Sequence, residues 1–468
     1  MEIEQKQDNS GRREFFKKSL MVSAGFMGLR YFSVSKSTAP DGFQLYDKYG
    51  PLLDDPQGIL NLPKGFSYKI ISKSGELMDD GFISPGRNDA MAAFESKDGK
   101  VLVIRNHEIS SDDPESGPFG ADNSKLYQLS NSQIYDRGYG KKPSLGGTTT
   151  FLFNENTQKM EYQYFSLAGT IRNCAGGPTP WNSWLSCEET VEKKEEGVNE
   201  HNHGYVFEVP VSETAKLADP IPLRDMGRFN HEAVAVDPDS GFVYLTEDRG
   251  DGLIYRFIPN EWGNLRAGGK LQALSLQVHK GFDTRNWDKQ TIKIGDQMAV
   301  EWIDLEDTDP EEDDLRLRGF NQGAARFARG EGMWYGNDEI YFACTNGGKA
   351  KNGQVFRYIP SRDEKKGAVK SGGVLELFAE PNDQKIISSC DNLTVAPWGD
   401  IVLCEDNLQP RIIGITQKGD IYHLGLNVGY ESELAGVCFS PSGKTLFVNI
   451  QHEGLTLAIT GPWEPMLT

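Results

Sequence analysis

The 468-residue sequence has no uninterrupted run of 18 apolar residues, and a membrane-spanning helix needs about that many. We therefore expect no stable membrane span in the mature protein. The sequence also lacks the G-x-S-x-G motif of serine hydrolases, any C-x-x-C pair, and the second histidine of a zincin motif. The segment "SPSGKT" resembles the end of a P-loop, but Cys438 stands where its first glycine would be. These absences exclude several common hydrolase, redox and nucleotide-binding motifs.

Basic residues are in the minority. The chain has 49 Lys and Arg against 68 Asp and Glu, which gives a net charge of −19. Residues 1–38 hold seven basic and four acidic side chains, so residues 39–468 carry −22. Such a surface repels nucleic acid and anionic lipid, and we expect no nucleic-acid partner. An enzyme acting on anions would need strong local positive charge at its site, which bound metal ions could provide.

The N-terminus resembles an export signal. "SGRREFFKKSLMVSAGFMGL" contains the pair Arg12-Arg13, followed by a short apolar run over about residues 20–29. This pattern is typical of a twin-arginine signal; the alternative is a chance Arg-Arg pair before an amphipathic helix. We predict a signal and spacer over residues 1–38 and a single domain over residues 39–468. The twin-arginine machinery would then export the folded chain to the periplasm or the medium.

Six cysteines are present, and an even number in an exported protein permits disulfides. Four of them lie in apolar, strand-like runs, where a cysteine is most often a small buried hydrophobic residue. Cys174 and Cys390 differ, because each lies next to polar, turn-forming residues. Cys174 opens the segment "NCAGGPTPWNSWLSCEE", which otherwise reads as a plain β-hairpin.

The hairpin pattern recurs six times. Each copy begins with a polar or metal-binding residue, continues through a short run of small or apolar residues to a turn, and ends in a strand with a second polar cluster. The six copies are "NDAMAAFESKDGKVLVIRNHE" (88–108), "NCAGGPTPWNSWLSCEE" (173–189), "HEAVAVDPDSGFVYLTED" (231–248), "GEGMWYGNDEIYFACTN" (330–346), "CDNLTVAPWGDIVLCEDN" (390–407) and "SELAGVCFSPSGKTLFVNIQHE" (432–453).

Six similar hairpins predict an all-β fold, a six-bladed β-propeller with loop insertions, in which these hairpins form the inner strands. A β-solenoid or two β-sandwiches would be the alternatives. The acidic segment "DLEDTDPEEDDLRLRGF", within the long interval 232–331, reads as a surface insertion. In four copies the first and last polar positions are 15 residues apart: Cys174 to Glu189, Glu232 to Glu247, Glu331 to Asn346 and Asp391 to Asp406.

In a propeller the ends of these hairpins converge on the central axis. The first positions are Asp89, Cys174, Glu232, Glu331, Asp391 and Glu433, and the last include Glu108, Glu189, Glu247, Asn346, Asp406 and Gln451. So many acids in one cavity would raise one another's pKa unless cations were bound. Oxygen ligands suit Ca²⁺ or Mg²⁺, whereas a thiolate suggests a softer metal such as iron or zinc. The sequence therefore predicts a mixed metal cluster.

Each acid taken alone could instead be a polar strand end in water, or could bond to a neighbouring blade. His201 and His203 in "EHNHG" are possible metal ligands, but they follow the charged run "EKKEEG". We expect both histidines to lie in an exposed loop.

Several motifs together resemble the PhoX-type alkaline phosphatases and their uncharacterised relatives. They are "VIRNHE", "NCAGGPTPWNSWLSCEE", "GRFNHEA", "ARGEG" and "LAGVCFSPSGKTLFVNIQHEG", and the resemblance covers roughly residues 45–463. It implies a six-bladed propeller with two iron ions and several calcium ions at its centre. It also implies an exported enzyme that hydrolyses phosphomonoesters.

The resemblance assigns roles to individual residues. It implies that Cys174, Glu189 and Glu232 bind iron, that Glu189 or Glu108 is shared with calcium, and that Glu331 is a metal carboxylate. Arg329 would face the substrate phosphate as the catalytic arginine. Asp391, Asn392 and Glu433 are the implied calcium ligands, and Asp89 joins the metal-binding set through its repeat position.

Two departures from the family pattern stand out. The chain is shorter than many members, which implies fewer insertions over the site. It also has "RGEG" where members tend to have Arg-Pro-Glu, which leaves the pose of the arginine open.

Three functions compete at this stage. The first is an exported, metal-dependent phosphatase that acts as a monomer on small phosphorylated substrates. The second is a calcium-dependent lactonase or phosphotriesterase on a similar propeller, which "CDN" at 390–392 would fit but a cysteine ligand would not. The third is a non-enzymatic propeller that binds a protein or polysaccharide.

Overall fold

The computed structural model describes residues 45–464. The predicted signal and its boundary at residue 38 lie outside these residues. Strands dominate the described chain, and its two α-helices, α2 (Leu315–Asn321) and α3 (Arg362–Lys365), are both short. No helix in the described part is long and apolar enough to cross a membrane.

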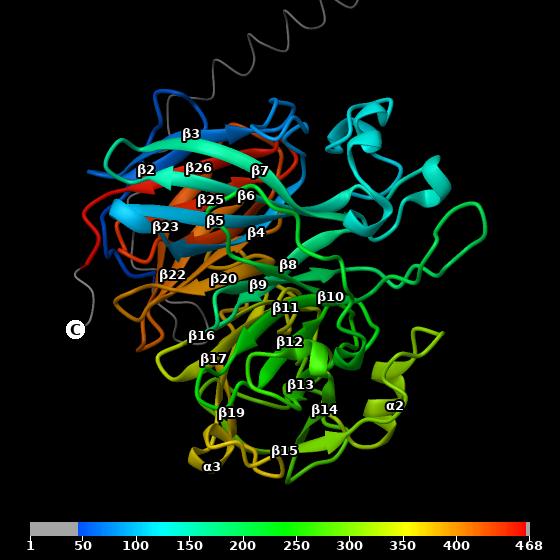
Figure 1. The fold of residues 1–468 in the computed structure, drawn as a ribbon. Coiled ribbons are helices and arrows are strands. Elements are labelled where there is room, and N and C mark those ends of the chain that lie inside the picture. Colours follow the sequence, from blue (N-terminus) through cyan, green and yellow to red (C-terminus); the bar gives the residue numbers. More distant parts are fainter. Residues whose placement is uncertain (1–44, 465–468) are drawn as a thin grey trace, which may run out of the picture. The chain divides into compact units, whose positions relative to one another are not determined.

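The first three blades follow one another along the chain (Figure 1). Blade 1 contains β4 (Asn88–Glu95), β5 (Lys100–His107), β6 (Gly146–Asn154) and β7 (Lys159–Thr170). Blade 2 contains β8 (Asn173–Pro178), β9 (Ser183–Glu188) and β10 (Val206–Pro210). Blade 3 contains β11 (His231–Val236), β12 (Val243–Glu247), β13 (Ile254–Pro259) and β14 (Gly269–Leu276).

Of the last three blades, blades 5 and 6 also include strands from the N-terminal end of the described chain. Blade 4 contains β16 (Gly330–Gly336), β17 (Glu339–Cys344), β18 (Gln354–Ile359) and β19 (Val374–Ala379). Blade 5 contains β20 (Cys390–Val395), β21 (Ile401–Glu405), β22 (Arg411–Ile415) and β23 (Ile421–Asn427), with β2 (Leu60–Pro63) and β1 (Leu52–Leu53) at its outer edge. Blade 6 contains β24 (Leu434–Phe439), β25 (Thr445–Ile450), β26 (Leu455–Thr460) and β3 (Ser67–Lys73).

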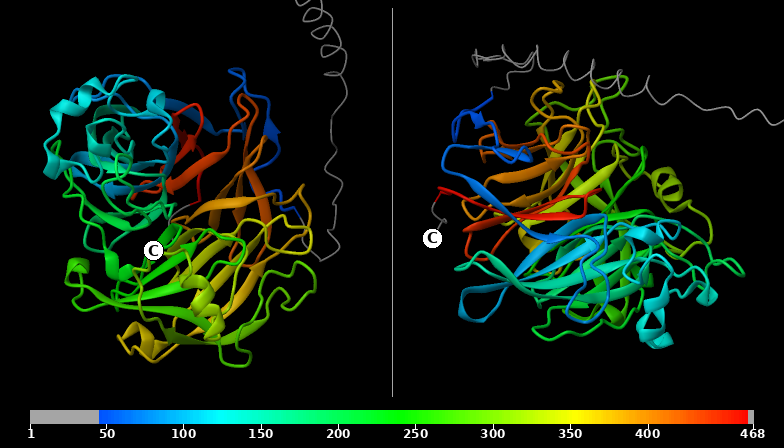
Figure 2. Two further views of the ribbon diagram at one scale, coloured as in Figure 1. Left: turned by 90° about the vertical axis from the view of Figure 1, so that its right-hand side faces the viewer. Right: turned by 90° about the horizontal axis from the view of Figure 1, so that it is seen from above.

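The blades form a closed ring. Their innermost strands contact one another in the order β4, β8, β11, β16, β20 and β24, and β24 contacts β4 again. The colours in the left view of Figure 2 follow this order around the axis. The N-terminal strand β3 pairs with the C-terminal strand β26 and so completes blade 6. The predicted all-β propeller is confirmed, and the recurring hairpins are its inner strands.

The six blades make only five hydrogen-bonded sheets. The strand β15 (Gln297–Asp304) pairs with β14 on one side and with β19 on the other, which joins blades 3 and 4. The sequence analysis did not single out this strand, "QMAVEWID", which lies just before the acidic segment that we read as a surface insertion.

A second irregular segment connects β5 to β6. It contains four short 3-10 helices: η2 (Pro114–Ser116), η3 (Ser124–Gln128), η4 (Asn131–Gln133) and η5 (Gly138–Gly140).

Apolar side chains fill the space between neighbouring blades. The strand β17 shows why: its side chains alternate between the two faces. Ile340 and Phe342 pack into one cluster of core residues, and Tyr341 and Ala343 pack into another. Because both faces of such a strand are buried, it reads in sequence as an apolar run rather than as a polar-apolar alternation.

Every inner strand carries a β-bulge at its axial end. In five blades the register with the second strand shifts just after the first paired residue, as between Asn88 and Met91 in blade 1. In blade 6 it shifts one residue later, between Ala435 and Cys438. A bulge re-aims the side chain that it carries. In five blades the re-aimed residue directly follows the first strand residue, and in four of these it is an acid.

Candidate functional site

A cavity of about 190 Å³ lies where the bulged strand ends meet. Nine of its lining residues are carboxylates, two are arginines, and Cys174 and Gln451 complete the set. The lining comprises Asp89, Glu108, Arg172, Cys174, Glu189, Glu232, Asp248, Arg329, Glu331, Asp391, Asp406, Glu433 and Gln451.

The cavity has a buried floor and a more exposed rim. The residues at the bulges form the floor, and each of them is less than 9% exposed, with Cys174 at 4%. The residues that follow the second strands vary: Glu108 and Glu189 are half-buried and Asp406 is exposed, whereas Asp248 and Gln451 are buried. Depth in the cavity therefore follows only in part from the position of a residue in its hairpin.

Side chains of the preceding blade hold several bulges in place. Asn449 donates a 2.6 Å hydrogen bond to the carbonyl oxygen of Asp89, and Thr246 donates one of 2.8 Å to that of Glu331. Asn106 does the same at 3.1 Å to the carbonyl of Cys174. These bonds satisfy carbonyls that the bulge removes from the strand ladder, and they fix where the floor residues point.

Glycine allows neighbouring inner strands to approach closely. A Cβ atom at Gly177, in "NCAGG", would lie 1.9 Å from the carbonyl oxygen of Val234 on the inner strand of blade 3. Any side chain there would push blades 2 and 3 apart and move Cys174 away from Glu232.

Two groups of side chains are close enough to share a cation. One ligand atom from each of Cys174, Glu189 and Glu232 lies within 4.8 Å of the other two, and the same holds for Glu232, Glu331 and Asp391. Glu232 belongs to both groups. Two positions separated by one shared carboxylate suit a multinuclear metal cluster.

Without cations this cavity would hold far more negative than positive charge. Burial, followed by repulsion from neighbouring acids, raises the pKa of five cavity carboxylates well above the usual range; they are the floor residues Asp89, Glu232, Glu331 and Asp391, and the half-buried Glu433. The same causes raise the pKa of Glu189 to about 8. Because a bound cation removes both penalties, the donor set fits metal ions.

The thiol of Cys174 shares this environment. Burial, and then the charges of Glu232 and Glu189, raise its pKa well above that of a free cysteine. A metal ion would reverse the shift, because coordination deprotonates a thiol outright.

Two arginines extend over the carboxylates. Arg329 donates to both oxygens of Asp248, at 2.8 and 2.7 Å, and its Nη2 also donates to Glu331 at 2.9 Å. Arg172 bonds to Glu189 through Nη2, and the same atom lies 2.7 Å from Glu108. Both arginines are fixed in direction, yet neither side chain is fully buried.

The sequence matches the family described as alkaline phosphatase PhoX over residues 47–159 and 152–454. The chain belongs to the PhoX family. Among solved structures, Pseudomonas fluorescens PhoX in complex with vanadate has a TM-score of 0.64 at 18% identity, with 89% of this chain and 98% of that chain covered. This likeness supports the propeller fold.

A gluconolactonase from Xanthomonas campestris is more distant. Its TM-score is 0.37 at 11% identity, with 88% of this chain and 98% of that chain covered. No curated protein matches the sequence.

Nine of the ten residues that the sequence singled out line the cavity of this PhoX family member. Asn392 does not. Its side-chain oxygen accepts a 2.6 Å hydrogen bond from the Gly436 N–H, and it lies in the channel below the cavity. That bond uses an oxygen that a calcium ion would need.

Sequence reasoning placed two strand ends wrongly and gave no role to one cavity arginine. Glu247 does not line the cavity, because its carboxylate accepts bonds from Leu253 N–H and the Tyr255 hydroxyl; Asp248 lines it instead. Asn346 also lies outside the lining. Arg172 went unnoticed, although it precedes the cysteine hairpin just as Arg329 precedes the hairpin of blade 4.

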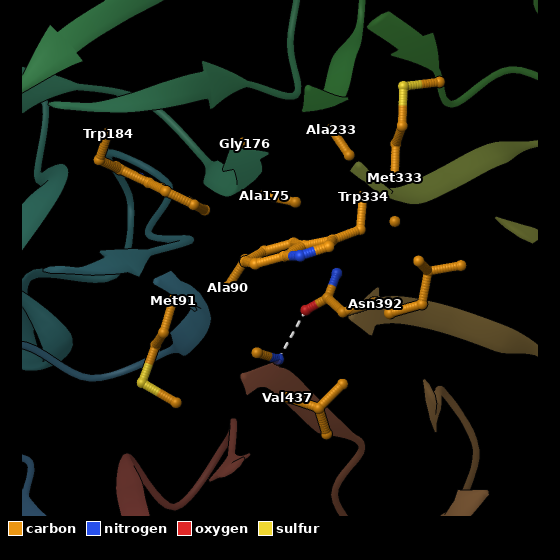
Figure 3. A pocket seen from close by; sticks show the side chains of 13 residues that line it. Ala90, Met91, Ala175, Gly176, Trp184, Ala233, Met333, Trp334, Asn392 and Val437 are labelled. Carbon is orange, nitrogen blue, oxygen red and sulfur yellow. Dashed lines mark hydrogen bonds between the residues drawn. The ribbon is translucent and has the colours of Figure 1, made fainter. Parts of the chain in front are cut away.

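The channel below the cavity is closed. One step further along the inner strands stand Ala90, Ala175 and Ala233, and the indole of Trp334 fills the space between them (Figure 3). Only about 10 Å³ remains open, no more than about one water molecule requires.

His203 is buried, which contradicts the predicted exposed loop; His201 is exposed as expected. The ring of His203 lies between two carboxylates, with Nδ1 2.6 Å from Glu188 and Nε2 3.3 Å from Asp136. Burial alone would lower its pKa, but these partners, Glu188 first, raise the pKa of His203 to about 9.

This cluster predicts a pH-dependent stability in this PhoX family member. We expect His203→Gln to cost about 3–5 kcal/mol, since removing one partner of a buried pair leaves the other unpaired. The folded pKa of His203 lies above the usual 6.5. The contribution of protonated His203 to the stability of the wild type is therefore complete below pH 6.5 and is lost as pH rises through 9. Thermal melts between pH 6.5 and 9.5 would show the slope in the wild type and not in the variant. The exposed His279→Gln is the control, and equal melts for wild type and His203→Gln would contradict the prediction.

Proposed function

We propose that the protein is an exported, metal-dependent phosphatase that hydrolyses phosphomonoesters at an iron and calcium cluster on the propeller axis. One observation carries this proposal: a buried thiol and two carboxylates, Cys174, Glu189 and Glu232, share one binding position, and Glu232 extends into a second. Membership of the PhoX family supports the reaction class.

The donor atoms suggest which metal each group would hold. A thiolate with carboxylates favours a transition metal such as iron, so iron would bind at Cys174, Glu189 and Glu232. Oxygen-only donors suit calcium, which would bind among Glu331, Asp391 and further carboxylates of blades 1, 5 and 6; these are Asp89, Glu108, Asp406 and Glu433. Metal ions bound there would neutralise the phosphate charge and supply Lewis acidity.

The protein's own contribution at the phosphate centres on Arg329. Nε and Nη2 of Arg329 each donate a hydrogen bond to Asp248, and these two bonds orient the guanidinium plane. Its Nη1 has no hydrogen-bond partner among residues 45–464 and would donate to a phosphate oxygen. Asp248 is then a positioning residue, because it acts through Arg329.

The closed channel and the acidic exterior also suit this reaction. Trp334 blocks one end of the axis, so the phosphate ester would enter from the rim, between the two arginines. Positive charge confined to the cavity would draw in an anion that the acidic surface as a whole repels.

Elemental analysis of the purified protein, together with an assay on p-nitrophenyl phosphate, tests the proposal. We expect iron and several equivalents of calcium, with hydrolysis that chelation abolishes and that added Ca²⁺ and iron restore. Calcium without iron, with turnover of lactones or phosphotriesters instead, would favour the second function considered above. Little bound metal and no turnover would favour a binding propeller.

We also propose export by the twin-arginine route, with a periplasmic or secreted product. The support is the pair Arg12-Arg13 ahead of a short apolar run. Cell fractionation checks this proposal, and full-length protein found only in the cytoplasm would contradict it.

A further inference from the structure

One backbone position recurs immediately before the inner strands. Its carbonyl oxygen accepts a hydrogen bond from the N–H of the residue that follows the second strand of the same blade. The pairs are Arg87 with Glu108, Arg172 with Glu189, Asn230 with Asp248, Arg329 with Thr345, Ser389 with Asp406, and Glu433 with Gln451. Three of these six positions are arginines.

Arg172 and Arg329 occupy this position with the same backbone conformation. Their φ angles are 49° and 53°, in the left-handed region that few residues other than glycine adopt. A shared backbone conformation at a shared repeat position directs the two side chains alike, each from its own blade toward the axis.

Their contacts with the preceding blade are equivalent as well. Arg329 bonds to Asp248 and Arg172 contacts Glu108, and each of these acids directly follows the second strand of the preceding blade. Each arginine also contacts an acid of its own blade: Glu331 at the inner-strand bulge for Arg329, and Glu189 after the second strand for Arg172. Arg172 is thus the counterpart of Arg329, two blades away around the ring.

Arg172 also has hydrogen-bond donors without partners. Its Nε is buried and has no hydrogen-bond partner among the described residues, and its Nη1 likewise has none there. The side chain is 40% exposed and lines the cavity. The Nη1 of this partly exposed guanidinium therefore offers N–H donors to a ligand, and a phosphate oxygen is an acceptor that suits a guanidinium.

We propose that Arg172 is a second substrate-binding arginine, which holds the phosphate group of a monoester together with Arg329 from a second direction. The proposal rests on the phosphatase function proposed above. A monoester carries up to two negative charges on three terminal oxygens, whereas a diester carries one charge on two. Two guanidinium groups would therefore favour monoesters over diesters, which makes Arg172 a specificity-determining residue.

The chain supplies a matched control. Arg87 occupies the same repeat position with the same φ of 49°, but it pairs with Asp113 at 3.4 Å and does not line the cavity. Glutamine and lysine replacements place the same backbone demand on all three positions, so effects confined to residue 172 come from its side chain.

The test compares wild type, Arg172→Gln, Arg172→Lys and Arg87→Gln, all metal-loaded and checked by elemental analysis. We measure kcat and KM on p-nitrophenyl phosphate and on bis(p-nitrophenyl) phosphate, and the Kd of inorganic phosphate by calorimetry. We expect Arg172→Gln to weaken phosphate binding and raise the monoester KM about tenfold or more, with diester turnover much less affected. The phosphate Kd and monoester KM of Arg172→Lys should fall between those of the wild type and Arg172→Gln, because lysine keeps the charge but lacks the planar guanidinium. Arg87→Gln should match the wild type.

Two outcomes overturn the proposal. One is unchanged phosphate affinity and monoester preference in an Arg172→Gln protein with full metal content. The other is a phosphate defect that appears in Arg172→Gln and Arg172→Lys only in step with lost metal, which would make the residue a support for Glu108 and Glu189. Failure of the wild type to hydrolyse or bind phosphate would instead defeat the proposed function itself, and this inference with it.

Discussion

We expect Glu232→Gln to lower kcat/KM on p-nitrophenyl phosphate by about a thousandfold or more, with loss of most bound metal. Glu232 is the only residue common to both groups of ligands identified within residues 45–464. An amide keeps the size of the side chain but removes the charge and one anionic donor. Even partners outside the coordination sphere commonly change metal affinity or activity by 10–100-fold, so a shared ligand should have a larger effect.

Glu247→Gln is the matched control, because Glu247 ends the second strand of the same hairpin and its carboxylate binds within its own blade. We expect this variant to lower Tm while the protein keeps its metal. Metal content and turnover at wild-type levels in Glu232→Gln would contradict the shared role of Glu232.

Cys174→Ser should remove iron and with it nearly all hydrolysis, while calcium is retained to a greater extent. Serine preserves the volume of the buried side chain, but its hydroxyl is a far poorer ligand for a soft metal than a thiolate. Inductively coupled plasma analysis of iron and calcium, alongside the phosphatase assay, measures both effects.

Cys187→Ser controls for the loss of a buried thiol, since Cys187 lies on the facing strand of the same hairpin but does not line the cavity. We expect it to keep its iron. Iron at wild-type stoichiometry in Cys174→Ser would remove this cysteine from the ligand set.

The fold was predictable because the repeat is strong in the inner strands. Each inner hairpin ends in polar residues at the axis, and this pattern remains visible in sequence whatever lies between the hairpins. The strand β15 was not predictable, because a strand that links two blades has no counterpart in the other blades and so forms no repeat.

The site was predictable to within one residue at most positions. A spacing of 15 residues selects Glu189 and Asp406 correctly. What the blades share, however, is the backbone pairing of their two inner strands, and turns of different length change the number of residues between the paired positions. In blade 3 the turn is longer and Asp248 replaces Glu247; in blade 4 the register position is Thr345. Only the structure shows the bulges and the hydrogen bonds that set this register.

Buried ion pairs were the feature that the sequence predicted least well. His203 follows a highly charged run, yet its partners Glu188 and Asp136 lie 15 and 67 residues away in the sequence. Charge composition within a short window cannot reveal partners that the fold brings together.

Trp334 turns the axis of the ring into a blind pit. Whatever enters, whether an ester, a metal ion or water, must come back out past the same rim, and released phosphate would leave against the inflow of the next ester. Free phosphate in solution should therefore inhibit turnover, and hydrolysis should slow as phosphate accumulates.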